Sequence, residues 1–166
     1  MNFDKRFAAA NQQHSIEACA FKTRIVFALL TIASVTGCAT GPAFQSPETA
    51  PADRAQLYVY RPLVLAGGGV SHKVTIDGKA ETLSLPNASW QRVTLAPGAH
   101  SVAIRDYFNL MPCGVLVIEV QPGQTAYVAN VVKTTPGLGA LYISCSVVAR
   151  APDQALKEIA GLSGAQ

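Results

Sequence analysis

Between Ala55 and Val148 the chain is a succession of short segments rich in Val, Ile, Tyr and Thr, separated by Gly, Pro, Asn and Asp. Short β-branched and aromatic runs with regularly spaced turn residues are typical of β-sandwiches and β-barrels. We therefore expect an all-β fold, a mostly antiparallel β-sandwich of about seven to eight strands. The expected strands are Gln56–Arg61, His72–Ile76, Glu81–Leu85, Trp90–Leu95, His100–Asp106, Val115–Val120, Thr125–Lys133 and Leu141–Val148.

The pair Asp77-Gly78 marks a tight hairpin in this region. A type I′ turn needs a positive φ at both central residues, which Asp tolerates and Gly adopts freely. Alternation with a period of two then assigns the side chains that face the core. The expected inward set is Leu57, Val59, Val74, Ile76, Leu83, Leu85, Val93, Leu95, Val102 and Ile104.

Two further segments complete the expected fold. Val115–Val120 is apolar on nearly both faces, which predicts a central strand or one covered by another element. Residues 151–166 are expected to form a short helix that packs on or flanks the sandwich, with Asp153 as N-cap and an apolar stripe containing Ile159. This helix is the expected cover for Val115–Val120.

Residues 1–37 have the layout of a leader with a signal peptide. Lys22 and Arg24 precede the uncharged segment Ile25–Val35, which is much shorter than the roughly 20 apolar residues of a membrane-spanning helix. The next residues resemble the lipobox of bacterial lipoproteins: Val35, Thr36 and Gly37 would be recognised by the signal peptidase, and Cys38 would carry the covalent lipid. A single-span anchor and a chance cysteine are the alternatives.

Lipidation of Cys38 would make the membrane a partner of the mature chain. Ala39 follows the cysteine in place of Asp, which by analogy with enteric bacteria favours the outer membrane, facing the periplasm, with the inner membrane as the alternative. Residues 38–54 are rich in Ala, Thr, Gly, Pro and Ser and predict a flexible tether, followed by the sandwich domain at residues 55–150.

The charge content limits the partners of the chain. Charged residues are 14% of the sequence and the net charge is +3. Because nucleic-acid binders need dense Lys and Arg, nucleic acid is not an expected partner.

Three stretches together resemble one family, the lipoproteins that carry domain of unknown function 2846. They are Leu57-Tyr58-Val59-Tyr60-Arg61-Pro62, Val74-Thr75-Ile76-Asp77-Gly78-Lys79 and Thr94-Leu95-Ala96-Pro97-Gly98-Ala99-His100. The resemblance covers roughly Ala55 to Val148. It implies a compact, mostly antiparallel β-sandwich on the cell envelope, and it brings no activity with it.

Cys113 and Cys145 are the cysteines that remain if Cys19 is removed with the leader and Cys38 is lipidated. An even pair in an oxidising compartment favours a disulfide. Buried free thiols and a redox or metal site are the alternatives, and the absence of a Cys-x-x-Cys spacing disfavours the latter. No metal ligand is assigned.

His72 and His100 are the histidines after the leader, and we interpret both as solvated or turn-capping residues. Asp77, Asp106 and Ser71 are nominal partners for a catalytic site, but they form no recognisable triad pattern, so no catalytic residue is assigned. A possible binding surface is Tyr58, Tyr60, Arg61 and Trp90, for which burial in the core or under a helix is the alternative. Arg61 is also a candidate buried partner for Glu119.

These observations favour a non-enzymatic protein, a binding or assembly accessory to an envelope protein or to peptidoglycan. The alternatives are an envelope hydrolase or isomerase that uses the loop histidines, and a purely structural lipoprotein. No cofactor is expected beyond the covalent lipid on Cys38.

Overall fold

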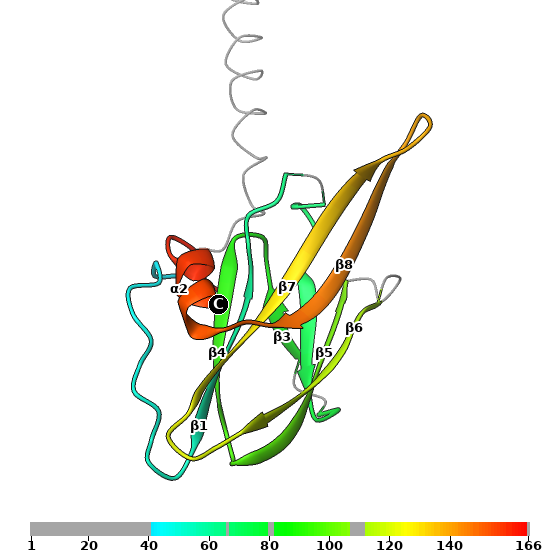
Figure 1. Ribbon diagram of the computed structural model, residues 1–166. Helices are drawn as coiled ribbons and strands as arrows, with labels where there is room; N and C mark the ends of the chain where they lie inside the picture. The colour runs from blue at the N-terminus through cyan, green and yellow to red at the C-terminus, as the bar shows by residue number, and fades with distance from the viewer. Residues whose placement is uncertain (1–40, 66, 80–81, 107–111, 166) are drawn as a thin grey trace, which may run out of the picture. The chain divides into compact units, whose positions relative to one another are not determined.

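The structure, a computed structural model, describes residues 41–65, 67–79, 82–106 and 112–165, and the leader and the lipobox lie outside this part. Two sheets form the fold (Figure 1). One has five strands in the order β8-β7-β1-β4-β9, and the other has four in the order β3-β2-β5-β6. The elements are β1 (Ala55–Arg61), β2 (His72–Ile76), β3 (Thr82–Leu85), β4 (Ser89–Leu95), β5 (Gly98–Asp106), β6 (Pro112–Val120), β7 (Thr125–Pro136), β8 (Leu141–Ala149), α2 (Pro152–Ile159) and β9 (Ser163–Gly164).

The sequence prediction of an all-β fold with a short C-terminal helix is confirmed. Most strand pairs are antiparallel, and two pairs, β1 with β7 and β4 with β9, are parallel. The hairpin turn forms as expected, because Asp77 and Gly78 have φ values of 52° and 65°. Lys79 N donates to Ile76 O at 3.0 Å across this turn.

The main core lies between the two sheets and contains most of the predicted inward set. Leu57 and Val59 of β1 meet residues of β2, β5, β6 and β7, and all of these side chains are buried. A disulfide between Cys113 of β6 and Cys145 of β8 joins the two sheets covalently, as the sequence favoured. The core side chains are Ala55, Leu57, Val59, Val74, Ile76, Leu85, Leu95, Val102, Ile104, Cys113, Ile118, Val120 and Val128.

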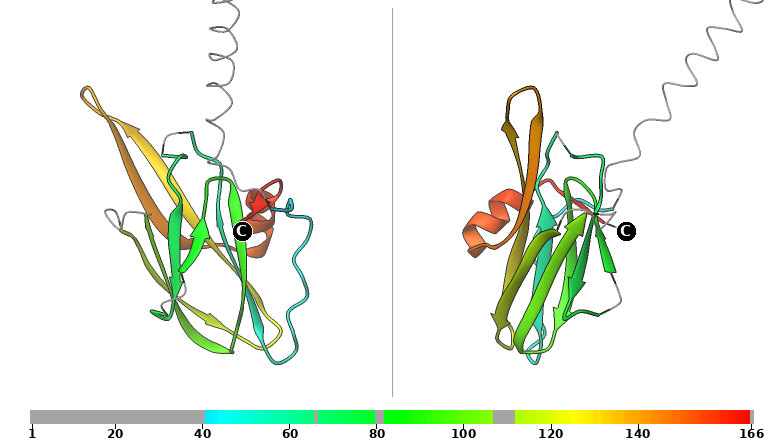
Figure 2. Two further views of the ribbon diagram at one scale, coloured as in Figure 1. Left: turned by 180° about the vertical axis from the view of Figure 1, so that it is seen from behind. Right: turned by 90° about the vertical axis from the view of Figure 1, so that its right-hand side faces the viewer.

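A second core lies on the outer face of the five-stranded sheet. Helix α2 covers this face with Ala155 and Ile159, which pack on Tyr58 and Tyr60 of β1 (Figure 2). All seven residues of β1 are consequently buried. The central strand of the fold, covered on both faces, is therefore β1.

The prediction that Val115–Val120 is either a central strand or one covered by the helix is wrong in both forms. β6 is the last strand of the four-stranded sheet, and Val115 and Val117 are each 67% exposed. The helix has its apolar stripe against the other sheet, where the large rings of β1 offer more area to bury. Asp153 is also not the N-cap, which is Ala151, and Pro152 begins the helix.

The prediction of a flexible tether at residues 38–54 is also wrong for the residues of this segment that the structure describes. From Gly41 onward the segment lies against the domain: Gly41 N donates to Gly164 O, and Phe44 N donates to Leu162 O at 2.8 Å. The Phe44 ring packs edge-on against Tyr58 with centroids 5.7 Å apart, and Ala50 is buried. One aromatic ring and these backbone hydrogen bonds outweigh the tether-like composition.

Candidate functional site

The expected aromatic binding surface is an internal cluster. Tyr58 and Tyr60 are 1% and 0% exposed, and Trp90 is partly buried beside them. Tyr58 stacks on Tyr127 at 5.7 Å and meets Trp90 at 5.9 Å. The rings alternate with core residues along β1 as predicted, but α2 and the segment at residues 41–54 cover them. The surface interpretation is therefore wrong for Tyr58 and Tyr60, and the alternative of burial holds.

Tyr60 joins the helix to the sheet by a polar contact. Its hydroxyl donates to Glu158 Oε2 at 2.6 Å, and Arg150 Nε lies 3.4 Å from the same oxygen. Burial and the adjacent carboxylate raise the pKa of Tyr60 far above its usual value. Burial opposes ionisation of Glu158, but the hydrogen bonds from Tyr60 and Gln154 outweigh it and lower the pKa of Glu158.

Arg61 is fully buried and belongs to the scaffold, so its place in a binding surface is also corrected. Its guanidinium donates to the carbonyl oxygens of Val70, at 2.5 Å, and Gly67, at 2.9 Å. Burial lowers its pKa to about 10. The partner of Arg61 is thus the β1–β2 loop, residues 62–71, and the expected pairing with Glu119 is not what these contacts show.

His72 lies in the interior next to Arg61. It is 3% exposed, and Asn130 Nδ2 of β7 is in hydrogen-bond contact with its Nδ1 atom. Burial, together with the positive charge of Arg61, lowers the pKa of His72 to about 4, although Asn130 and Asp106 act in the opposite direction. The interpretation of His72 as a solvated residue is therefore wrong. A neutral, buried imidazole connects β2 to β7.

His100 caps a turn, as expected. Its Nδ1 lies 2.7 Å from Asp77 Oδ2, and its Nε2 lies 2.8 Å from Ala96 O. Asp77 Oδ1 also accepts a hydrogen bond from Ser101 N at 2.8 Å. Two acceptors at the two ring nitrogens favour the imidazolium, so the hydrogen bond to Asp77 and that to Ala96 raise the pKa of His100. The hydrogen bond from His100, followed by that from Ser101, lowers the pKa of Asp77.

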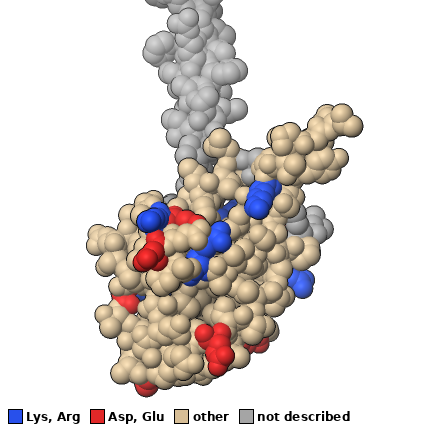
Figure 3. All heavy atoms as spheres, viewed as in Figure 1, with Lys and Arg blue, Asp and Glu red and all other residues tan. Residues whose placement is uncertain are grey.

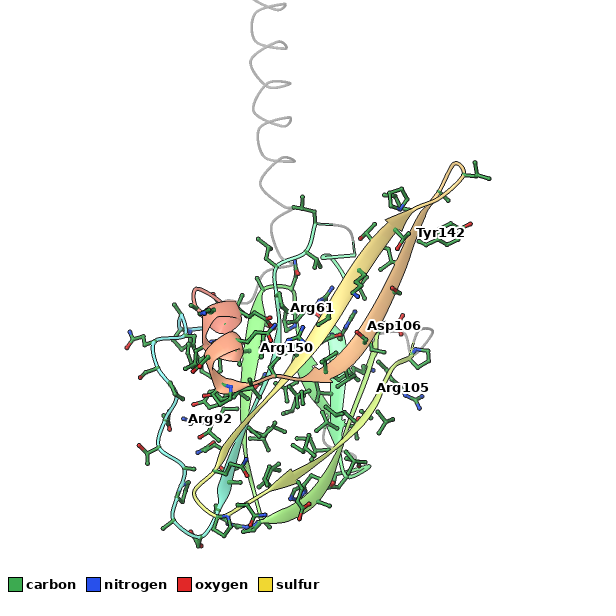
Figure 4. The ribbon with its side chains drawn as sticks, in the orientation of Figure 1. Arg61, Arg92, Arg105, Asp106, Tyr142 and Arg150 are labelled. Atoms are coloured by element: carbon green, nitrogen blue, oxygen red, sulfur yellow. A yellow bond between two sulfur atoms is a disulfide. The ribbon has the colours of Figure 1, made fainter. Side chains whose placement is uncertain are left out.

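The open surface of the domain offers one groove beside the exposed valines of β6. It has a volume of about 310 Å³ and lies between β6, β7 and the start of α2. Val117 and Glu119 form one wall, and Tyr127 and Arg150 contribute to the others. Figure 4 shows Arg150 between the helix and the crossing strands β7 and β8. Apolar, aromatic and charged groups that converge in this way suit the binding of a polar chain such as a peptide or glycan.

Sequence reasoning missed this groove because it depends on the outer face of β6 being open. The residues that line the groove are mostly ordinary strand residues, and they form no recognisable sequence motif. The available signal was the apolar outer face of Val115–Val120, which we assigned to burial under the helix.

A second exposed apolar region lies on the β7–β8 hairpin. The two strands remain paired as far as Pro136 and Leu141, well past Arg61, where β1 ends. Beyond the disulfide, residues 133–144 project from the sandwich (Figure 1); we call this part of the hairpin the arm. The arm carries exposed Leu138, Leu141 and Tyr142, and Figure 4 labels Tyr142 near its tip.

Within the described residues, no group of three or more His, Cys, Asp or Glu side chains is placed to hold a metal ion. In the same part of the chain, no helix has the length and apolar character to cross a bilayer. No protein-family model matches the chain, and no curated protein matches it either.

Proposed function

We propose that this chain is a lipid-anchored lipoprotein of the bacterial cell envelope, and that its domain is a non-enzymatic binding or assembly accessory. The proposal keeps the resemblance to lipoproteins with domain of unknown function 2846 and an anchor in the outer membrane, facing the periplasm. The observation that carries it is that Gly41, three positions after the lipobox cysteine Cys38, is already hydrogen-bonded to the domain through Gly164. A lipid on Cys38 would hold the domain directly at the membrane surface.

The groove beside β6 is the surface that supports a binding role. Val115 and Val117 remain two-thirds exposed next to a groove with charged and aromatic walls. Apolar side chains that stay exposed beside a groove offer contact area to a partner. An envelope protein that presents an extended segment fits the strand-lined groove, with peptidoglycan as the other partner to be tested.

The two histidines support this choice over an envelope hydrolase or isomerase. A general base needs a ring nitrogen that can reach substrate. Both nitrogens of His100 face protein acceptors, and His72 is 3% exposed with Nδ1 facing Asn130. These contacts assign the histidines to the scaffold.

The anchor is tested by the intact mass of the membrane-extracted protein, wild type beside Cys38→Ala. We expect a wild-type mass that begins at an acylated Cys38 and loss of both cleavage and lipid in the variant. An unprocessed chain that starts near Met1 would overturn the lipoprotein assignment in favour of a single-span anchor.

The groove is tested by crosslinking in cells, followed by mass spectrometry of the co-purified envelope material. Val117→Lys places a charge in the groove, and Ser84→Lys places the same charge on the exposed opposite edge of the same sheet. We expect Val117→Lys to lose a partner that wild type and Ser84→Lys retain. Equal crosslinking by all three proteins would remove the groove from the proposal.

A further inference from the structure

We infer that the end of the domain from which the arm projects rests on the lipid surface to which the protein is anchored, with the apolar tip of the arm inserted at the membrane interface. This inference rests on the proposed lipidation of Cys38. It adds a second, non-covalent membrane contact made by the folded domain itself.

The arm projects from one end of the sandwich (Figure 1). At this end β1 stops at Arg61 opposite Ser89, and β2 starts at His72 opposite Asp106. The contact between His72 and Asn130 holds the ends of the two sheets together. We call this the arm end.

Gly41 lies at the same end. It is bonded to Gly164 of β9, and β9 pairs with Ser89 and Trp90 at the start of β4. Gly41 is three positions after Cys38, a span of at most about 11 Å for an extended chain. An acylated Cys38 would therefore keep Gly41, which lies at the arm end, within about 11 Å of the bilayer surface.

The reach of the arm matches this distance. The disulfide partner Cys145 lies opposite Val132, and pairing continues from there to Pro136 opposite Leu141. Four residues of strand and the turn that follows extend about 15 Å at the rise of a β-strand. The arm is thus long enough to bring its tip to the headgroup region, which lies outside the hydrocarbon core.

The exposed side chains at the arm end are those that favour a lipid interface. Leu138 at the tip is fully exposed, and Leu141 and Tyr142 are 64% and 63% exposed. Tyr is enriched at membrane interfaces because its ring is apolar and its hydroxyl is polar. Leu138 is fully solvated at the tip of the paired hairpin and buries nothing within the domain, so its apolar area is available to lipid.

The β1–β2 loop adds two more leucines at this end. Leu63 and Leu65 are 65% and 96% exposed. The loop is held in place, because the Asn87 side chain bonds both N and O of Val64, and Arg61 bonds Gly67 and Val70. A Cβ built on Gly67 would lie 3.5 Å from the Ile143 side chain, so this loop adjoins the arm. The five exposed side chains therefore belong to one region.

The charge distribution suits a lipid surface that carries anionic headgroups. The described cations at the arm end include Lys133 on the arm and Arg105 on β5, both exposed, whereas the carboxylate there, Asp106, is buried. Asp53, Asp77 and Glu119 lie at the opposite end of the strands. In Figure 3 the arm shows no acidic side chain. Basic side chains (blue) lie at its base, and acidic side chains (red) lie over the helix and at the far end of the domain. Leucine, tyrosine and exposed cations together complement anionic headgroups above an acyl region.

The test uses the full-length lipidated protein in vesicles of phosphatidylethanolamine and phosphatidylglycerol. Leu138→Trp places a fluorophore at the tip, and Val117→Trp places one at an exposed apolar site on β6, away from the arm. The wild type, with Trp90, gives the background. In lipids brominated on their acyl chains we expect the added emission of Leu138→Trp to be quenched about threefold more strongly than that of Val117→Trp, as for an interfacial side chain.

Equal quenching of the two variants in vesicles that carry the acylated protein would overturn the inference and leave the proposed anchor intact. A photo-reactive residue at position 138 should form lipid adducts in cells, and a crosslink to a protein or to a second copy would also overturn it. If the extracted wild-type protein has no acyl mass on Cys38, the proposed function fails first. Mass spectrometry of the same sample therefore separates the two failures.

Discussion

The imidazole of His72 packs against the disulfide that joins the two sheets, with its Nδ1 atom 3.7 Å from Sγ of Cys113. Cys113 belongs to β6, Cys145 to β8, and His72 to the first position of β2. The base of the arm is therefore held by one covalent link and by a buried polar contact to Asn130 of β7. Stability and the direction of the arm depend on the same few residues.

His72 makes the protein sensitive to acid. Its pKa is about 4 in the folded state, against about 6.5 in the unfolded chain, so the unfolded state binds the extra proton between these values. The free energy of unfolding should fall by about 1.4 kcal/mol for each pH unit below about 6.5 until the pH reaches about 4. Denaturant unfolding in a His100→Gln background, which removes the other histidine of the domain, measures this slope.

The matched control is His72→Gln in the same background, which should flatten the slope because the titrating group is gone. An NMR titration gives the pKa directly. A midpoint for His72 near the ordinary histidine value would contradict the buried neutral imidazole.

The disulfide should contribute about 3 to 4 kcal/mol to stability, because it closes a loop of sequence separation 32. Cys113→Ala combined with Cys145→Ala should lower the free energy of unfolding by that amount. The arm loses its link to β6 in the same variant, so the amides of residues 133–144 should exchange faster. Hydrogen exchange under native conditions compares them with the β1–β4 amides, which should keep their relative protection.

The strands were predictable because a period of two in apolar residues records which face meets the core. Leu57, Val74 and Val102 all point inward as the alternation requires. The same pattern left open what covers the outward face. Tyr58 and Tyr60 face outward from the first core but are covered by a helix almost a hundred residues further along the chain, a relationship that depends on tertiary packing.

The remaining differences have the same origin. The two-residue strand β9 exists because Ser163 and Gly164 pair with Ser89 and Trp90, and its own composition carries no strand signal. Phe44 was the one large apolar residue in a stretch that otherwise indicated a tether, and it proved to be the contact that seats this segment. The histidine contacts are also set by the fold, since Asn130 follows His72 by 58 positions.

The pair of His100 and Asp77 should stabilise the protein most in mildly acidic solution. The pKa of His100 is raised, so its contribution to the free energy of unfolding is complete below about pH 6.5 and is lost as the pH rises through the pKa of the folded state. The pKa of Asp77 is lowered, so its contribution to the free energy of unfolding requires a pH above about 4. His100→Gln should cost at most about 1 kcal/mol near pH 6 and less near pH 8, as is usual for pairs near the surface.

Asp77→Asn is the control for this pair. Asn tolerates the φ of 52° at this position, so the hairpin is retained while the negative charge is lost. The pKa of His100, followed by NMR, should then fall towards its ordinary value. An unchanged titration would show that Ala96 O alone raises it.

The hydrogen bond from Tyr60 to Glu158 should be the main polar link between α2 and the five-stranded sheet. Tyr60→Phe removes the hydroxyl, keeps the ring and leaves the half-buried carboxylate without its shortest hydrogen bond, so we expect a loss of about 1 to 2 kcal/mol in denaturant unfolding. Glu158→Gln retains an amide oxygen that can accept a hydrogen bond from Tyr60, so it should lower the free energy of unfolding by less.

Ile159→Ala removes apolar contact from the same helix and should lower the free energy of unfolding by about 2 to 4 kcal/mol. If Tyr60→Phe proves as stable as wild type while Ile159→Ala is destabilised, apolar packing alone holds the helix in place.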